Sequence, residues 1–250
     1  MYSRCRSDEE MTDNNSAFRG ADCAGLPLFL RQKTVAGLHD FVVDNALQSF
    51  CAKPGVSIDL GAGSGALAVR LRSLGWNVTA ADIGASEYKA DVPFVHLDLN
   101  EPDFAARLGE QTFDLVTSFE VIEHLESPIG FLRNVRRLLK PHGVAVITTP
   151  NVDNAAARLK FLLTDRVWMV SRFTPEHISP IFCDIAIHHF LPRAGLRLLK
   201  HSVYPTGNII PEDFLLTRSW LIPFLRAALT PFRSSVLLGN SHIFIVGRMC

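Results

Sequence analysis

Two carboxylates and an imidazole stand close together in the sequence, at Glu120, Glu123 and His124. They follow residues 111–119, an apolar and β-branched run typical of a buried strand. If a helix begins at Val121, the three side chains occupy positions i, i+3 and i+4 and share one face. Carboxylates and imidazoles can bind a divalent cation, and an imidazole can accept a proton near neutral pH. The stretch is therefore a candidate site for metal binding or for acid–base chemistry.

A glycine-rich loop offers a second candidate site. Residues 56–60 have the apolar pattern of a buried strand, and Gly61, Gly63 and Gly65 follow at alternate positions. Residues 66–74 then show the apolar spacing of a helix. A strand, a glycine loop and a helix in this order can cradle a nucleotide, because glycines let the backbone approach a ligand closely.

The residue types around this loop indicate which nucleotide it suits. Gly61, Gly63, Ala66 and Asp82 also satisfy the looser dinucleotide fingerprint. Asp59, however, precedes the first glycine by two positions, and its carboxylate would repel a pyrophosphate at the helix N-terminus. A ligand with an ammonium and a sulfonium group suits it better, which favours S-adenosylmethionine over NAD. The structural alternative is that Asp59 only caps the loop or the helix.

The rest of the chain places further acidic residues at the same edge of a sheet. Strands alternate with helices, which predicts an α/β fold with a parallel sheet whose ligands bind at the carboxyl ends of the strands. Four acids stand at such ends: Asp59, Asp82, Asp98 and Glu120. The predicted strands are residues 56–60, 76–82, 94–98, 111–119 and 144–149, and the predicted helices are residues 34–50, 66–74, 128–139 and 155–163.

Composition limits the classes of protein to which the chain can belong. With 250 residues, 48% of them hydrophobic, the chain can bury one full α/β core, which we expect over residues 26–250, after a disordered segment at 1–25. Equal numbers of basic and acidic residues, 25 each, argue against nucleic-acid binding.

The polar N-terminus indicates no signal peptide. Five dispersed cysteines without metal-binding spacing indicate reduced thiols and a cytoplasmic location: Cys5, Cys23, Cys51, Cys183 and Cys250.

Taken in order, the motifs resemble those of class I S-adenosylmethionine-dependent methyltransferases, over residues 34–199. The loop Asp59-Leu-Gly-Ala-Gly-Ser-Gly65 resembles the family's first motif, and residues 138–151 resemble its fifth-strand motif, with His142 where glycine is commoner. The resemblance implies that Asp82 binds the ribose hydroxyls and that Asp98 lies beside the adenine amino group. The implied cofactor contacts are Asp59, Gly61, Ala62, Gly63, Gly65, Asp82, Ile83, Asp98, Leu99 and Phe119.

The same resemblance implies the architecture of the sheet. It predicts a Rossmann-like, mostly parallel sheet of seven strands with helices on both faces and an antiparallel last strand. Residues 201–204 and 241–248 fit the last two strands, and the continuous apolar run at 243–246 suits an interior strand.

Locally, the Glu120–His124 stretch is similar to that of two methyltransferase groups, the small-RNA terminal 2′-O-methyltransferases and the O-methyltransferases of ubiquinone biosynthesis. That similarity implies a metal site at Glu120, Glu123, His124 and His177, for a cation such as Mg²⁺. A metal-free alternative remains open, in which His124 and His177 are catalytic residues that contact the acceptor or remove its proton. Glu123 could equally be an acid in the first turn of a helix.

Two segments are candidates for the acceptor side. Residues 152–176 follow the fifth strand and form a candidate lid. Residues 208–238 combine apolar side chains with Arg218, Arg226 and Arg233, a composition that suits either a helix lying on an anionic membrane or a cover over a lipophilic acceptor. An insertion packed on the sheet is the plain alternative.

The sequence thus predicts a cytoplasmic methyltransferase, with possible peripheral membrane contact, that acts on a small or lipid-like molecule, preferentially at oxygen. An RNA 2′-hydroxyl is the second acceptor, although the neutral charge disfavours it. The sequence also leaves open a dinucleotide-dependent oxidoreductase and a catalytically silent module of the same fold.

Overall fold

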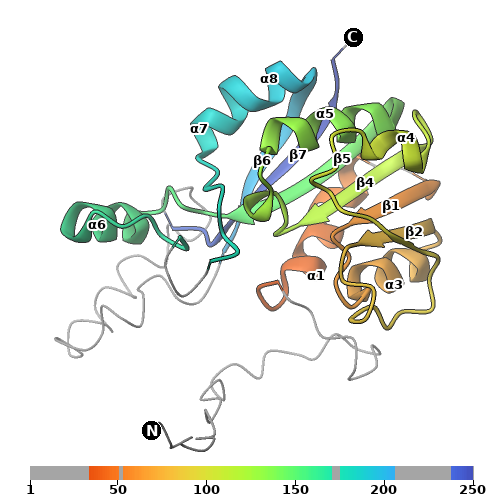
Figure 1. Ribbon diagram of the computed structural model, residues 1–250, viewed down its shortest axis with the longest axis horizontal. Coiled ribbons are helices and arrows are strands. Elements are labelled where there is room, and N and C mark those ends of the chain that lie inside the picture. Colours follow the sequence, from red (N-terminus) through yellow and green to blue (C-terminus); the bar gives the residue numbers. More distant parts are fainter. Residues whose placement is uncertain (1–33, 51–52, 171–174, 206–237, 250) are drawn as a thin grey trace, which may run out of the picture.

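A single mixed sheet of seven strands forms the centre of the molecule (Figure 1). The computed structural model describes residues 34–50, 53–170, 175–205 and 238–249. The strand order is β3-β2-β1-β4-β5-β7-β6, with parallel pairing except at β7, which is antiparallel to both β5 and β6. The strands are β1 (Val56–Leu60), β2 (Asn77–Asp82), β3 (Phe94–His96), β4 (Phe113–Phe119), β5 (Leu139–Pro150), β6 (Leu196–Tyr204) and β7 (Ser241–Arg248). The predicted fold class is confirmed.

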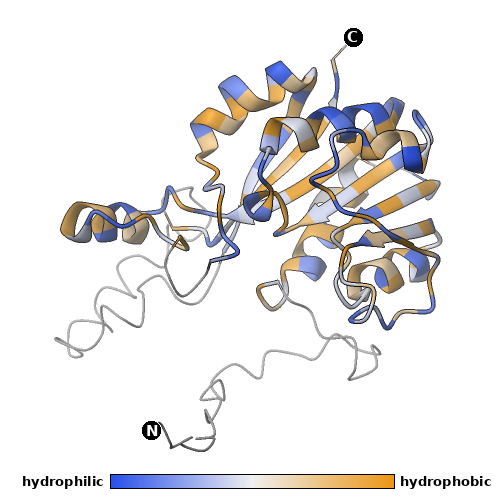
Figure 2. Cartoon of the chain, viewed as in Figure 1, coloured by the Kyte–Doolittle hydropathy of each residue, from blue (hydrophilic) through white to orange (hydrophobic). Residues whose placement is uncertain are grey.

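Helices cover both faces of this sheet, as predicted. One layer holds α1 (Leu38–Val42), the π-helical turn η1 (Val43–Leu47), α2 (Gln48–Phe50) and α3 (Ala66–Ser73). The other holds α4 (Phe104–Leu108), α5 (Pro128–Leu138), α7 (Cys183–Ile185), the π-helical turn η3 (Ala186–Phe190) and α8 (Leu191–Ala194). The central strands are correspondingly apolar (Figure 2), because both of their faces are buried.

Helix α5 shows how the sequence fixes one of these elements. Ser127 caps its N-terminus by accepting a hydrogen bond from the Gly130 amide at 3.1 Å, and Pro128 occupies the first turn, where its missing N–H costs nothing. Phe131, Leu132, Val135 and Leu138 share one stripe and are buried against the sheet.

Several boundaries differ from the predicted ones, each for a local reason. The helix predicted from residue 34 begins at Leu38, because Gly37 takes a left-handed conformation with φ 82°. Strand β5 begins at Leu139, five residues early, because the chain forms a bulge between its pairings with Phe113 and Leu115. Strand β3 ends at His96, so Asp98 follows the strand at a distance of two residues.

The helix predicted to begin at Val121 is a single 3₁₀ turn, η2 (Ile122–His124). Glu120 lies outside this turn with φ 55°, a left-handed conformation that is uncommon for a residue other than glycine. The three side chains of the motif therefore do not share a helical face. The chain reverses sharply after β4 instead, and Glu120 and Glu123 accept hydrogen bonds from different threonines of β5.

The predicted lid is partly described. Helix α6 (Ala155–Thr164) occupies the expected residues and stands away from the sheet (Figure 1). The predicted disorder at 1–25 and the predicted insertion at 208–238 lie outside the described residues, apart from Leu238. Among the helices that the structure describes, none combines the length and the apolar character needed to cross a lipid bilayer.

Candidate active site

A cavity of about 790 Å³ opens at the carboxyl ends of β1, β2 and β4. Its volume lies within the range of small-molecule sites. All four acids that the sequence places at strand ends line it. Of the predicted site residues, Gly65 alone is absent from the lining, which contains Asp59, Gly61, Ala62, Gly63, Asp82, Ile83, Asp98, Leu99, Phe119, Glu120, Glu123, His124 and His177.

The glycine loop forms one wall of the cavity. Gly61 has φ 75°, and a Cβ there would lie 2.3 Å from the Val121 side chain, so no larger residue fits without a shift. The Gly63 amide donates to Asp82 Oδ2 at 2.8 Å, and the Gly84 amide donates to Oδ1 at 2.6 Å. These two bonds fix the Asp82 carboxylate at the cavity wall. Gly65 serves the turn itself, since it precedes α3 with φ 91°.

Asp59 lies at the floor of the cavity with only 2% of its surface exposed. The Thr117 hydroxyl donates to its Oδ1 at 2.8 Å. The pKa of Asp59 is raised to about 7, chiefly by burial. The hydrogen bond from Thr117 lowers this pKa, and the nearby charge of Asp82 raises it. A cationic ligand would stabilise the ionised carboxylate, whereas a pyrophosphate would oppose it. The floor therefore fits a sulfonium or ammonium group.

Two further carboxyl groups line the cavity just after the end of β4. Glu123 is 4% exposed and accepts a hydrogen bond from the Thr149 hydroxyl through Oε2, at 3.1 Å. Its Oε1 has no hydrogen-bond partner among the described residues. Burial raises the pKa of Glu123 to about 8, and the charge of Glu120 adds to this rise. Glu120 accepts from the Thr148 hydroxyl at 3.0 Å, and burial raises its pKa to about 7.

Backbone carbonyls set the tautomers of His124 and His177. His124 Nδ1 lies 2.9 Å from the Glu176 carbonyl oxygen, and His177 Nδ1 lies 2.8 Å from that of Met169. A carbonyl can only accept, so both Nδ1 atoms carry a proton, and in the neutral form of each ring Nε2 carries the lone pair. Burial lowers the pKa of His124, and the neighbouring His177 lowers it further, which favours the neutral ring.

Glu123, His124 and His177 form what we call the cavity cluster. The ring centroids of His124 and His177 are 4.6 Å apart, and one potential ligand atom from each of the three residues lies within 4.8 Å of the others. Glu123 Oε1 and His124 Nε2 are 3.9 Å apart. Glu120 is not part of this group and bonds Thr148 instead. The structure thus brings together three of the four residues considered as metal ligands.

His39 is a cavity residue that the sequence reasoning missed. It is 5% exposed, packs edge to face on Phe119 at 5.4 Å between ring centroids, and lines the cavity. Burial lowers its pKa to about 4, so the ring is neutral at pH 7. The sequence did contain an indication of this role, because His39 is a polar residue on a helix face that otherwise carries the apolar Leu38 and Val42.

Comparison with known proteins identifies the family. A family model described as a methyltransferase domain matches residues 31–201. The chain belongs to this methyltransferase family. This methyltransferase uses S-adenosylmethionine as the methyl donor, in agreement with the buried Asp59 carboxyl group at the floor of its cavity.

Curated relatives and solved structures add to this assignment. The methyltransferase is 36% identical over 186 residues to a ubiquinone biosynthesis O-methyltransferase of Ruegeria pomeroyi, in a match that covers 70% of this chain and 73% of the relative. It is 33% identical over 139 residues to the mitochondrial ubiquinone biosynthesis O-methyltransferase of Schizosaccharomyces pombe, covering 51% of this chain and 50% of that one. A SAM-dependent methyltransferase structure from Archaeoglobus fulgidus shares the fold, with a TM-score of 0.56, 17% identity and coverage of 82% and 93%.

Proposed function

We propose that this methyltransferase transfers the methyl group to a hydroxyl oxygen of a small or lipid-like acceptor that binds beside the cavity cluster. The observation that carries the proposal is the pair of imidazoles whose Nδ1 atoms are held by backbone carbonyls, which leaves two Nε2 lone pairs beside the cofactor loop. The relatives named O-methyltransferases of ubiquinone biosynthesis support oxygen as the accepting atom.

The cofactor side of the proposal assigns S-adenosylmethionine to the cavity wall and floor. When bound, it supplies an electrophilic methyl group on a sulfonium. Asp82 would accept hydrogen bonds from the ribose hydroxyls, Asp98 would lie beside the adenine, and Asp59 would face the cationic part. The assigned contacts are Asp59, Gly61, Ala62, Gly63, Asp82, Ile83, Asp98, Leu99 and Phe119, and Gly65 shapes the turn.

On the acceptor side, His124 and His177 are assigned as the residues that orient the hydroxyl and accept its proton. A neutral imidazole is the suitable base, and the lowered pKa of His124 favours that form at neutral pH. Removal of the proton assists attack on the methyl carbon, and most of the remaining rate comes from holding the two reactants in line.

A second role of the same cluster is supported by the unpartnered Oε1 of buried Glu123. Glu123, His124 and His177 offer one carboxylate oxygen and two imidazole nitrogens, a set that suits a divalent cation. Such a cation would lower the pKa of an acceptor hydroxyl. The two roles differ in one respect: a ligating His124 Nε2 is no longer free to take the proton.

The candidate lid offers an apolar surface to a lipophilic part of the acceptor. Helix α6 exposes apolar side chains to solvent, at exposed fractions of 50% for Phe161, 80% for Leu162 and 60% for Leu163. Met169, in the same candidate lid, lines the cavity. We assign residues 152–176 to contact with a lipid-like acceptor or the membrane that holds it, together with residues 208–238.

The cofactor assignment is tested by calorimetry. Asp82→Ala should weaken S-adenosylmethionine binding by about 1–3 kcal/mol, because charge-assisted hydrogen bonds to the ribose are lost. Asp91→Ala, which changes an exposed carboxylate, is the matched control. Unchanged affinity in Asp82→Ala would refute the assignment.

The acceptor class is tested with labelled S-adenosylmethionine and three acceptors: a short phenol, a phenol with an isoprenoid tail and an RNA oligonucleotide. We expect label on oxygen of the phenols, with the tailed one preferred. Preferential labelling of the RNA would replace the proposed acceptor, and label on carbon or nitrogen would overturn the oxygen assignment.

A further inference from the structure

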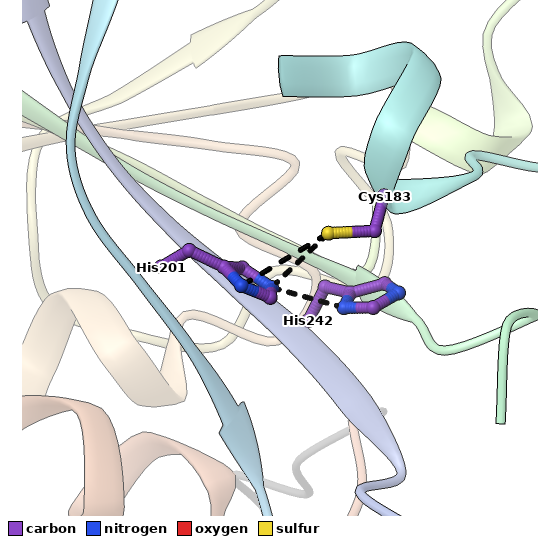
Figure 3. Close-up of side chains that lie close together, drawn as sticks. All are labelled: Cys183, His201 and His242. Carbon is purple, nitrogen blue, oxygen red and sulfur yellow. Dashed lines mark hydrogen bonds between the residues drawn. The ribbon is translucent and has the colours of Figure 1, made fainter. Parts of the chain in front are cut away.

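A second group of ligating side chains lies outside the cavity lining. Cys183 comes from α7, His201 from β6 and His242 from β7, and their side chains point toward one another (Figure 3). We call these three residues the sheet-edge cluster. The spacing of the cysteines gave no sign of it, because the three residues come from three separate elements.

The distances within the sheet-edge cluster match those around a tetrahedral metal ion. Cys183 Sγ lies 3.5 Å from His201 Nε2, and His201 Nε2 lies 3.1 Å from His242 Nδ1. Ligands of tetrahedral zinc are separated by about 3.6 Å for a sulfur and a nitrogen and by about 3.3 Å for two nitrogens, given the usual Zn–S and Zn–N bond lengths. One ligand atom from each of the three residues lies within 4.8 Å of the others.

The surroundings hold these donors in place. Asp153 Oδ2 accepts from the Cys183 amide at 2.6 Å and lies 3.6 Å from His242 Nε2. It therefore faces the ring nitrogen opposite the one that points into the cluster, as the carboxylate partner of a metal-bound histidine does. Phe244 stacks on His201 with ring centroids 5.0 Å apart, which fixes the plane of that ring.

We propose that Cys183, His201 and His242 bind one zinc ion, with Asp153 orienting His242. Thiolate sulfur and imidazole nitrogen are the ligands that zinc prefers, and three protein ligands leave a fourth position for water. Binding releases the thiol proton of Cys183 to solvent. The proton between the two imidazole nitrogens moves to the outer nitrogen of its own ring, so both histidines bind as neutral rings. Cys183 and His201 are partly exposed, so the ion has a path of entry.

The zinc ion would fasten α7 to the edge of the sheet. The segment that leads into α7 carries His177, and the amides of Ile178 and Ser179 already donate to the Glu123 carbonyl at 3.0 Å and 2.9 Å. The ion would anchor the other end of this segment. The proposal is independent of the proposed function, since it uses no residue of the cavity cluster.

The test is cobalt binding to the full chain after treatment with a chelator. Co²⁺ bound by a thiolate gives a sulfur-to-metal charge-transfer band in the near ultraviolet, which carboxylate and imidazole ligands do not produce. We expect one equivalent of Co²⁺ to give the band and one equivalent of Zn²⁺ to remove it. A band that never appears at millimolar Co²⁺ would overturn the proposal.

Variants identify the ligands. Cys183→Ser should lose the band. The combined variant Cys5→Ser, Cys23→Ser, Cys51→Ser and Cys250→Ser should keep it. Asp153→Asn should weaken Co²⁺ binding about tenfold, as the loss of an orienting carboxylate does in other metal sites. His188→Gln, which changes an exposed histidine, should leave binding unchanged. A band retained in Cys183→Ser, or lost when the other four cysteines are replaced, would overturn the proposal.

A second measurement covers the case in which Cys183→Ser folds poorly. Zn²⁺ should raise the melting temperature of the combined variant Cys5→Ser, Cys23→Ser, Cys51→Ser and Cys250→Ser, and a rise should remain when His124→Gln is added. A rise that disappears with His124→Gln would place the ion in the cavity cluster and refute the sheet-edge site.

Discussion

The cavity cluster and the sheet-edge cluster contact the neighbouring strands β5 and β7 but face different surroundings. Thr149 of β5, whose hydroxyl donates to Glu123, is the cross-strand partner of His242 in β7. The cavity cluster lines the 790 Å³ cavity, whereas no member of the sheet-edge cluster does. One cluster contains a carboxylate and the other a thiol. We propose metal binding for both clusters and a role at the acceptor for the cavity cluster alone.

We expect substitutions in the cavity cluster to lower kcat far more than substitutions in the sheet-edge cluster. His124→Gln should lower kcat by about 10²–10⁴-fold, because general base catalysis contributes that much. His177→Gln should act in the same direction, and both should leave S-adenosylmethionine affinity nearly unchanged. Methyl transfer under saturating acceptor is the measurement. An equal loss of kcat in Cys183→Ser and His124→Gln would erase the distinction between the clusters.

The second prediction concerns Asp59 at the cavity floor and the pH dependence of the free energy of unfolding. The pKa of Asp59 is raised to about 7 in the folded chain, so its contribution to stability is present at low pH and is lost as pH rises through 7. Asp59→Asn should therefore stabilise the ligand-free chain at pH 8 by roughly 2–4 kcal/mol relative to the wild type, and by much less at pH 5. Urea unfolding at both pH values measures this.

S-adenosylmethionine provides the control for the Asp59 prediction. It should raise the stability of the wild type at pH 8 more than that of Asp59→Asn, because the cation offsets the cost of the buried carboxylate. Equal stabilisation of both chains, or a pH-independent effect of the substitution, would contradict the assigned role of Asp59.

A metal-binding comparison tests whether the two clusters differ in ligand preference. We expect Mn²⁺ to bind the cavity cluster and Glu123→Gln to weaken it by about 10–100-fold, without affecting the cobalt–thiolate band. Electron paramagnetic resonance of free Mn²⁺ measures the binding. If turnover persists fully in chelator, the histidines act without a metal; if Mn²⁺ restores lost turnover, the cation belongs to the catalytic site.

The smallest expected effect concerns α6. Leu162→Gln should raise KM for an isoprenoid-tailed acceptor by roughly three- to tenfold and leave KM for a short phenol unchanged, because one partly buried apolar contact is worth about 0.7–1.4 kcal/mol. Leu74→Gln, at a leucine that is 45% exposed at the end of α3, is the matched control. Equal KM changes for both acceptors would exclude α6 from tail binding.

The strand, glycine loop and helix beside the cavity floor could be predicted from the sequence because local signals are sufficient there. Residues 56–60 are all apolar or buried, the glycines mark the turn, and Asp82 ends its own strand. Each of these features depends on residues within a few positions of one another. The structure then brings Asp59, Asp82 and Asp98 to one cavity, because parallel strands align their carboxyl ends.

The arrangement of the cavity cluster and of the sheet-edge cluster could not be predicted in the same way, because it depends on contacts between distant residues. The left-handed backbone at Glu120 replaces the expected helix, and nothing within the motif signals it. His177 meets His124 only because the segment before α7 returns to the sheet and bonds the Glu123 carbonyl. His201 and His242 pair across β6 and β7, a juxtaposition that no spacing in the sequence encodes.

The position of β7 has a consequence for the order in which the chain folds during synthesis. Strand β6 borders only β7 in the sheet, yet β7 is made after it. Until β7 has been synthesised, the backbone groups of β6 have no neighbouring strand with which to form hydrogen bonds. The edge of β5 that pairs with β7 is also unpaired until then. Strand β7 pairs with both β5 and β6 and brings His242 beside His201.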